Sequence, residues 1–474
     1  MRWLGLLILL MVPGAAVAEQ GESAVAAGRA VLIQHECTRC HVIDDLPPAT
    51  RPRDCVGCHQ FIQGLAPHDE RYKQIAARYG AAVIERYQKN ISHLLVAPNL
   101  TRLAARVRPD WIADFLAAPY DVRPALSESM IRHRLSPDEQ RTVVRYFAAI
   151  ANIDEKSPSV PVPASDPTRV AAGEALFLER GCPACHSFGN RDTGVDAATL
   201  ASAGAAAALA PNLRFVKTRT RPEILVDWLI DPARIAPHTL MPAMGLDRAQ
   251  AELIRDFLFG ADPQLHPAPV AVPQVLPPLL PRQVSYAEMK ENVLGKVCVH
   301  CHMNAFEKDT GPGNLGGLGF AGVGLMMRTY ETLLWGAVGA DGKRHSVLQP
   351  RPGETIPPIL QAMLRRREEE RRDHVPSFAD YPRPAYPSGP LGMPLGLPSM
   401  NDHEIALLAT WIAQGCKGPA TVSGHADVGD GYLVPDGPIA KNQGCELRAP
   451  SVLRPEWAFD REGRAGIDRD SPAR

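Results

Sequence analysis

The apolar residues of this chain fall into short segments with helical spacing, and proline-rich stretches separate these segments. The segments between Pro109 and Pro119 and between Pro222 and Pro232 each place several apolar residues and one tryptophan along one side of a helix. A shorter apolar run at residues 26–33 predicts another helix. The pattern therefore predicts several short amphipathic helices joined by loops.

Polar residues that favour helix starts precede two further segments. Ser136 is followed by proline and two acidic residues, which predicts a helix through Phe147 with Ser136 as its N-cap. Asp247 has the same part before a helix that includes residues 253–259. Both segments are expected to be the closing helix of a folded unit.

The first two units are related by an internal duplication. Residues 98–119 match residues 211–232 without a gap, and each stretch begins with Pro-Asn-Leu and encloses one of the tryptophan helices. In both copies a glycine lies nine residues before a cysteine: Gly28 before Cys37 (37 − 28) and Gly173 before Cys182 (182 − 173). We therefore expect the same helical unit twice.

A third unit begins near Tyr286 and is less similar to the others. Its Arg- and Glu-rich segment 360–372 predicts a helix with a solvated charged face rather than a binding patch. Residues 404–412 predict the closing helix of this unit.

Four copies of Cys-x-x-Cys-His carry the candidate chemistry. They lie at residues 37–41, 55–59, 182–186 and 298–302, and this pattern is typical of c-type haem attachment. The expected thioether residues are Cys37, Cys40, Cys55, Cys58, Cys182, Cys185, Cys298 and Cys301, and the expected proximal iron ligands are His41, His59, His186 and His302. The sequence thus predicts four covalently attached haem c groups, numbered here in chain order.

A zinc half-site or a thiol–disulfide motif is the alternative interpretation of any single copy. Four copies behind an export signal disfavour it, and it leaves the histidine fixed after the second cysteine unexplained. The export signal consists of Arg2, the apolar run from Trp3 to Val12 and the small residues Ala16 to Ala18. An uncleaved membrane anchor is the alternative, but the run is shorter than the ~20 residues of a bilayer span. We expect a cleaved signal peptide, a mature chain without a transmembrane helix, and a periplasmic or exported location.

The two copies of the duplicated unit differ in length. Met130 lies 89 residues after His41 (130 − 41), whereas Met241 lies 55 after His186 (241 − 186). The 34 extra residues (89 − 55) fall where the second motif lies, so the first unit is expected to carry haem two on an insertion.

The charge balance of the chain bears on its partners, and its proline-rich stretches indicate its domain boundaries. Lys and Arg number 51 and Asp and Glu 52, a balance that gives no indication of a nucleic-acid or acidic-membrane partner. Proline contributes 45 of 474 residues, nearly double the average of about 5%, and stretches 157–167 and 262–282 are predicted linkers. The expected organisation is a signal peptide at 1–18, a dihaem domain at 19–156, monohaem domains at 168–262 and 283–420, and an irregular tail at 421–474.

Methionines at matching positions are the predicted distal ligands of three haems, as in cytochromes c. Met130 is assigned to haem one and Met241 to haem three, with Met244 as the rival of Met241. Met393, which precedes a proline, is assigned to haem four, with Met400 as its alternative.

Haem two lacks such a methionine, and its distal ligand is predicted among nearby histidines. His93 is preferred over His68, because it leads directly into the Pro-Asn-Leu segment. If neither binds, haem two is five-coordinate and open to small ligands. The two remaining cysteines, Cys416 and Cys445, are expected to form a disulfide in an oxidising compartment; two buried free thiols are the alternative.

The glycine spacing, Cys-x-x-Cys-His, Pro-Asn-Leu and Met-Pro together resemble the class I cytochrome c domain, most closely over residues 168–262. Residues 22–153 resemble the same family with a haem inserted, and residues 284–418 resemble planctomycete-type cytochrome c domains. The resemblance implies an all-α fold of three tandem cytochrome c-like domains, the first dihaem, joined by Pro-rich linkers. It also implies electron transfer.

We therefore expect an exported tetrahaem cytochrome c that relays single electrons between donor and acceptor redox partner proteins of a respiratory-type chain, an electron carrier rather than an enzyme. One alternative is a redox enzyme that reduces peroxide or an oxyanion at an open haem. Another is a cytochrome subunit docked to a membrane respiratory complex. A polymerising nanowire is least expected, because four haems share 456 mature residues (474 − 18).

Overall fold

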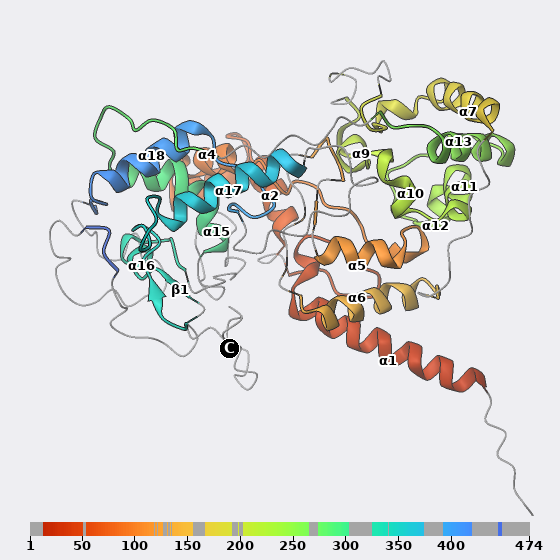
Figure 1. Ribbon diagram of the computed structural model, residues 1–474, viewed down its shortest axis with the longest axis horizontal. Coiled ribbons are helices and arrows are strands. Elements are labelled where there is room, and N and C mark those ends of the chain that lie inside the picture. Colours follow the sequence, from red (N-terminus) through yellow and green to blue (C-terminus); the bar gives the residue numbers. More distant parts are fainter. Residues whose placement is uncertain are drawn as a thin grey trace, which may run out of the picture.

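The computed structural model describes residues 13–50, 54–117, 119–120, 122–126, 130, 133, 135–154, 166–191, 198, 202–264, 274–302, 325–339, 341–373, 392–419 and 444–447. The protein is mostly helical, as expected for an all-α fold (Figure 1). In the described ranges the strands are β1 (Ala337–Val338) and β2 (Arg344–His345), which pair antiparallel with Ala337 opposite His345. No helix in these ranges is both long and apolar enough for a bilayer span.

The first unit contains α1 (Pro13–Gln34), η1 (Cys37–Arg39), α2 (Cys55–Gln63), α3 (Glu70–Tyr79), α4 (Ala81–Asn90), η3 (Leu103–Ala105), α5 (Pro109–Ala117) and α6 (Pro137–Ile150). Helix α1 begins at Pro13 and so passes through the predicted signal cleavage site, while the apolar run before it lies outside the described residues. Ser136 caps α6 with a capping box to Glu139, which confirms the predicted helix start.

The second unit repeats this order without the insertion. It contains α7 (Pro167–Glu179), η4 (Cys182–Ala184), α9 (Gly204–Leu209), η5 (Leu213–Phe215), α10 (Val216–Arg219), α11 (Pro222–Ile230), α12 (Pro232–Ile235) and α13 (Arg248–Gly260). Asp247 caps α13 with a capping box to Gln250, as predicted.

The third unit contains α14 (Tyr286–Met289), the π-helical segment η6 (Lys290–Cys298), α15 (Val299–Cys301), α16 (Tyr330–Leu334), the two strands, α17 (Pro358–Asp373) and α18 (Asp402–Ala413). Of the predicted tail, residues 444–447 are described.

Buried apolar residues form a separate cluster within each unit, and the domain boundaries themselves stay a prediction. The cluster of the third unit surrounds Trp411, and that of the second surrounds Phe257. The cluster of the first unit surrounds Tyr146 and also takes in Phe215 and Ile235 from the second. A small fourth cluster around Ile84 belongs to the insertion. In Figure 1, α7 and α10–α13 lie beside α5 and α6, while α2 and α4 lie with α15–α18 at the other end.

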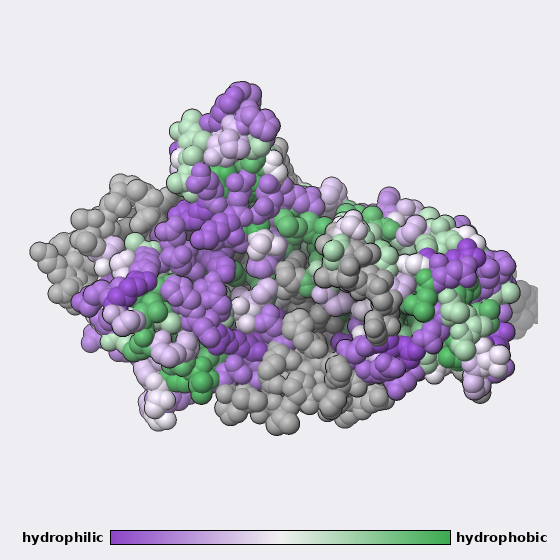
Figure 2. Space-filling view, turned by 90° about the horizontal axis from the view of Figure 1, so that it is seen from above, coloured by the Kyte–Doolittle hydropathy of each residue, from purple (hydrophilic) through white to green (hydrophobic). Residues whose placement is uncertain are grey.

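The surface is mainly hydrophilic with smaller hydrophobic areas between, as Figure 2 shows from above. Large apolar side chains that remain exposed include Val42 at 61% and Leu240 at 49%. Scattered apolar residues of this kind are normal on a soluble surface.

The glycine that precedes each cysteine by nine residues lies where two helices cross. Helix α1 packs on α6, and α7 packs on α13. A Cβ on Gly28 would lie 2.2 Å from Cβ of Tyr146, and a Cβ on Gly173 would lie 2.0 Å from the carbonyl oxygen of Leu253. Both distances are far inside van der Waals contact, so only glycine permits these crossings.

The two duplicated units face each other through reciprocal arginine–tryptophan contacts. The guanidinium of Arg219 lies over the ring of Trp111 at 5.3 Å, and that of Arg106 lies over the ring of Trp228 at 5.8 Å. The backbone N–H of Arg108 donates to the carbonyl of Arg219 at 2.9 Å. The equivalent residues Arg106 and Arg219 thus each contact a tryptophan of the other unit, and cation–π attraction favours these pairs.

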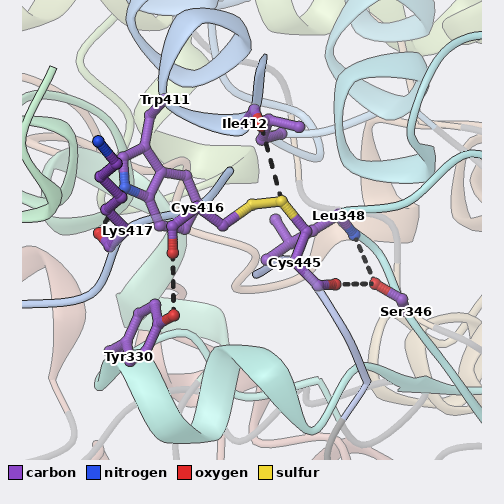
Figure 3. The surroundings of a disulfide bond; sticks show 8 residues. All are labelled: Tyr330, Ser346, Leu348, Trp411, Ile412, Cys416, Lys417 and Cys445. Carbon is purple, nitrogen blue, oxygen red and sulfur yellow. Dashed lines mark hydrogen bonds between the residues drawn. A yellow bond between two sulfur atoms is a disulfide. The ribbon is translucent and has the colours of Figure 1, made fainter. Parts of the chain in front are cut away.

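A disulfide joins Cys416 to Cys445, which confirms that prediction (Figure 3). The hydroxyl of Tyr330 donates to the carbonyl of Cys416 at 2.9 Å, and the hydroxyl of Ser346 donates to the carbonyl of Cys445 at 3.1 Å. Cys416 follows α18 and is fully buried. The bridge therefore fastens residues 444–447 to the core of the third unit.

The helix crossings predict the effect of one added methyl group. We expect Gly173→Ala to lower the free energy of unfolding by about 1–3 kcal/mol, because the methyl meets backbone atoms that cannot move aside easily. Ala175→Leu, on the exposed side of the same helix, is the control and should change it little. Denaturant unfolding of the mature protein measures both, and equal stability of Gly173→Ala and the parent would contradict the close crossing.

The disulfide predicts a second stability effect. Cys445→Ala should lower the free energy of unfolding of the third unit by about 2–4 kcal/mol, since the unfolded chain regains the freedom of a loop. Cys416→Ala should do the same or more because Cys416 is buried. Reduction of the parent protein provides the control and should reproduce the Cys445→Ala midpoint. An unchanged midpoint in Cys445→Ala would show that the bridge adds no stability.

Candidate functional site: the four Cys-x-x-Cys-His motifs

The first and third motifs have the same local structure. Each follows the end of a helix through one residue in the left-handed conformation, Glu36 (φ 50°) and Gly181 (φ 70°), and then forms a 3₁₀ turn, η1 or η4. Glycine favours this conformation, and Glu36 adopts it with a side chain. The duplication thus extends to the backbone of the motifs.

The second and fourth motifs are built differently. The second motif begins α2, whose N-cap Asp54 accepts a hydrogen bond from the backbone N–H of Gly57 at 2.8 Å. The fourth ends the π-helical segment η6 and continues into α15. In the first, third and fourth motifs the histidine N–H donates to the carbonyl of the first cysteine, at 3.1, 3.0 and 2.9 Å. This backbone hydrogen bond closes a turn. The three motifs therefore keep the first cysteine and the histidine close together, although their helix types differ.

All four histidines make the same side-chain hydrogen bond. Nδ1 pairs with a backbone carbonyl in each: His41 with Pro98 at 2.9 Å, His186 with Pro211 at 2.9 Å, His59 with His93 at 2.6 Å and His302 with Leu325 at 3.1 Å. A carbonyl oxygen only accepts, so Nδ1 must carry the proton and Nε2 keeps its lone pair. Each ring is therefore fixed in the tautomer that can bind a metal through Nε2, the arrangement that commonly orients metal-bound histidines.

Burial supports the neutral form of these rings. It lowers the pKa of His41, His186 and His302, because a charged imidazolium loses hydration there. A neutral imidazole is the form that binds metals.

The surroundings of the motif cysteines shift their thiol pKa values in different directions. None of the eight is in a disulfide, and all are partly exposed. Burial raises the pKa of Cys37 and Cys182 to about 11 and that of Cys298 and Cys301 to about 12. Cys55 differs, because its hydrogen bond with Cys40 lowers its pKa, which is the direction found in disulfide-exchange catalysts.

A cluster of metal-binding side chains does not form in the described parts of the chain: no three His, Cys, Asp or Glu residues gather as ligands there. Haem iron does not require such a cluster, because the porphyrin supplies four ligands and the protein supplies only the axial ones. The residues present therefore fit a haem better than a bare metal ion.

The structure gives Met241 a specific neighbour. The indole N–H of Trp228 donates to its sulfur at 2.8 Å, and Met241 packs against the core of the second unit, as does its rival Met244. The tryptophan of the first unit, Trp111, donates to the hydroxyl of Tyr120 at 2.8 Å instead. Met130 is half-buried, and most residues around it lie outside the described ranges. The hydrogen bond to Met241 was not expected, although both tryptophans were visible in the sequence.

Met393 is held by α17, whose charged residues were predicted to be solvated. That prediction is wrong, because Arg366 is only 6% exposed and donates to the carbonyl of Leu397 at 2.7 Å. Glu369 and Glu370 accept hydrogen bonds from the backbone N–H groups of Gly392 and Ser399. Charge patterning could not reveal this, because the partners are backbone groups far along the chain. The N–H of Met393 itself donates to Ala362 of α17 at 2.9 Å.

Met400, the alternative to Met393, is 2% exposed within the core of the third unit. Met393 is half-buried and lies in the segment that α17 fixes. The packing therefore favours Met393.

The two histidines proposed for haem two are not well placed for it. The side chain of His68 is 85% exposed and lies 3.5 Å from Asp69. His93 offers its carbonyl to Nδ1 of His59, so it lies on the side of that ring opposite to Nε2. A distal ligand of a bound haem would have to lie on the Nε2 side of the ring. The geometry therefore speaks against His93, although its backbone has a role at this site that sequence reasoning missed.

Sequence reasoning also missed Arg39, a buried cation inside the first motif. Its position between two motif cysteines was the available signal. Comparison of the chain with family models, with curated proteins and with solved structures gave no match.

Proposed function

We propose that this protein is an exported tetrahaem c-type cytochrome that passes single electrons between a donor and an acceptor protein. The observation that carries the proposal is the repeated Nδ1–H···O=C hydrogen bond on His41, His59, His186 and His302. Four different backbone segments supply the acceptor carbonyl. A histidine that merely filled a core would not need the same tautomer four times, each directly after a Cys-x-x-Cys pair.

The chain's residues have distinct parts in this function. The eight motif cysteines hold the haems, the four histidines provide the proximal ligand through Nε2, and Met130, Met241 and Met393 are the proposed distal ligands. Bound haem supplies an iron that gains and loses one electron reversibly. The backbone carbonyls orient each imidazole, and the hydrogen-bonded α17 frame positions the segment of Met393.

A cysteine and haem count tests the proposal directly. The chain has ten cysteines, of which eight are in the motifs and two form the disulfide. Protein purified from the periplasm of a host with c-type haem maturation should contain four haems per chain by mass and by pyridine haemochrome. When denatured, it should show no reactive thiol before reduction and two afterwards. Ten thiols after reduction, with no covalent haem, would refute the proposal.

One observation favours a second candidate function, reduction of a small molecule such as peroxide or an oxyanion at haem two. His68 is 85% exposed and the carbonyl of His93 is bonded to Nδ1 of His59, so this second candidate assigns neither histidine to the iron of haem two. Carbon monoxide should then bind to one reduced haem per chain, and the Cys55→Ser/Cys58→Ser double variant should lose that binding. Carbon monoxide without effect on the spectrum would leave only the carrier function.

The bond between Trp228 and Met241 predicts a shift in one midpoint potential. A donor on the sulfur reduces its electron donation to ferric iron, so Trp228→Phe should lower the potential of haem three, by up to about 1 kcal/mol in the free energy of reduction. Trp111→Phe is the matched control, since Trp111 bonds Tyr120 rather than a methionine. Spectroelectrochemical titration measures both variants. A potential of haem three that stays constant in Trp228→Phe would argue against Met241 as its ligand.

A further inference from the structure

Arg39 is a buried cation at the centre of the molecule's motif region. It lies inside the first motif, its residue is 5% exposed, and its Nε is 3.1 Å from Oε2 of Glu36, whose side chain is 32% exposed. Burial lowers the pKa of Arg39, yet an arginine remains protonated in proteins. A full positive charge therefore persists next to the cysteines of the motif, with one carboxylate beside it.

Cysteines of three motifs gather around this charge. The thiols of Cys40 and Cys55, the second cysteine of motif one and the first of motif two, hydrogen bond to each other. Cys301 of motif four interacts electrostatically with Cys55 and with Arg39. Motifs one, two and four, which are far apart in sequence, thus meet at one place.

A second contact joins the insertion to the third unit. The half-buried Tyr87 of α4 interacts with Cys58 of motif two and with Arg328. Arg328 follows Met327, whose N–H donates to the carbonyl of His302 at 2.8 Å. Figure 1 shows α2 and α4 together with α15 and α17 at the same end of the molecule. The insertion therefore seats motif two against motif four.

Contacts between motif cysteines determine how close the attached haems lie. A thioether sulfur is bonded to a side group of the porphyrin, so two motif sulfurs within hydrogen-bonding reach bring the edges of their haems close together. The third motif differs, because it carries Ala184 at the position of Arg39 and a buried Pro183 before it.

Building on the proposed function, we propose that haems one, two and four form a single cluster of interacting redox centres, with Arg39 as the shared positive charge that sets their potentials. The proposed cluster leaves out haem three, whose motif carries Ala184 in place of an arginine. Reduction adds one electron to a haem, and a nearby positive charge stabilises the reduced form. Arg39 thus raises the potentials of the cluster relative to the same haems without it.

Circular dichroism in the Soret band tests the cluster on the intact holoprotein, since closely spaced haems give a paired positive and negative signal. We expect this couplet in the parent protein. The Cys55→Ser/Cys58→Ser double variant, without haem two, should lose most of it. The matched Cys182→Ser/Cys185→Ser variant, without haem three, should keep it. A couplet that depends on haem three and not on haem two would overturn the proposed cluster.

A redox titration tests the part of Arg39. Arg39→Gln should shift the potentials of at least two haems to lower values and leave haem three unchanged; the titration wave missing from Cys182→Ser/Cys185→Ser identifies haem three. Arg29→Gln is the control for charge, because Arg29 forms an ion pair with Asp45 on the exposed side of α1. Arg39→Lys, which keeps the charge, should retain potentials close to the parent. Identical titrations for Arg39→Gln and the parent would refute the shared charge.

The two tests distinguish a wrong cluster from a wrong function. A chain without covalent haem would have no Soret band at all, whereas a tetrahaem chain with independent haems would have the band without the couplet. The dichroism test does not depend on the folding of any Arg39 variant.

Discussion

The hydrogen bond from an imidazole Nδ1 to a backbone carbonyl is the constraint around which each motif is arranged. It requires a loop to pass behind the histidine, and it leaves Nε2 directed away from that loop. The Pro98 and Pro211 segments provide that loop in the duplicated units, and proline there has no N–H that would need a partner of its own. In each case the bond leaves the lone pair on Nε2.

The helices that support these hydrogen bonds pack closely, because glycine at each crossing has no side chain to separate them. Gly28 and Gly173 allow the first and last helices of their units to cross at backbone contact. The reciprocal Arg106–Trp228 and Arg219–Trp111 contacts then join the two units. Burial lowers the pKa of Arg106 and Arg219 to about 10, but both remain charged at neutral pH. The duplicated units thus share an interface with two half-buried cations.

The insertion in the first unit also contacts the third unit. By carrying motif two onto the third unit, it links parts of the chain that the Pro-rich linker would otherwise only tether. Arg39 lies where these parts meet, which makes a single motif residue common to three attachment sites under the proposed function. The histidine of motif two also differs from the other three in its partner, since it pairs with the carbonyl of another histidine.

Local and covalent features of this protein were determined by its sequence alone. The four motifs, the duplication, the capped starts of α6 and α13 and the Cys416–Cys445 pair could be predicted because each depends on neighbouring residues or on residue counting. The tertiary structure decided which carbonyl orients each histidine, which side of His59 is occupied by His93, and what the charges of α17 bind. These are contacts between residues far apart in sequence, and their partners are often backbone atoms that every residue carries. No pattern of side chains can encode them without the fold.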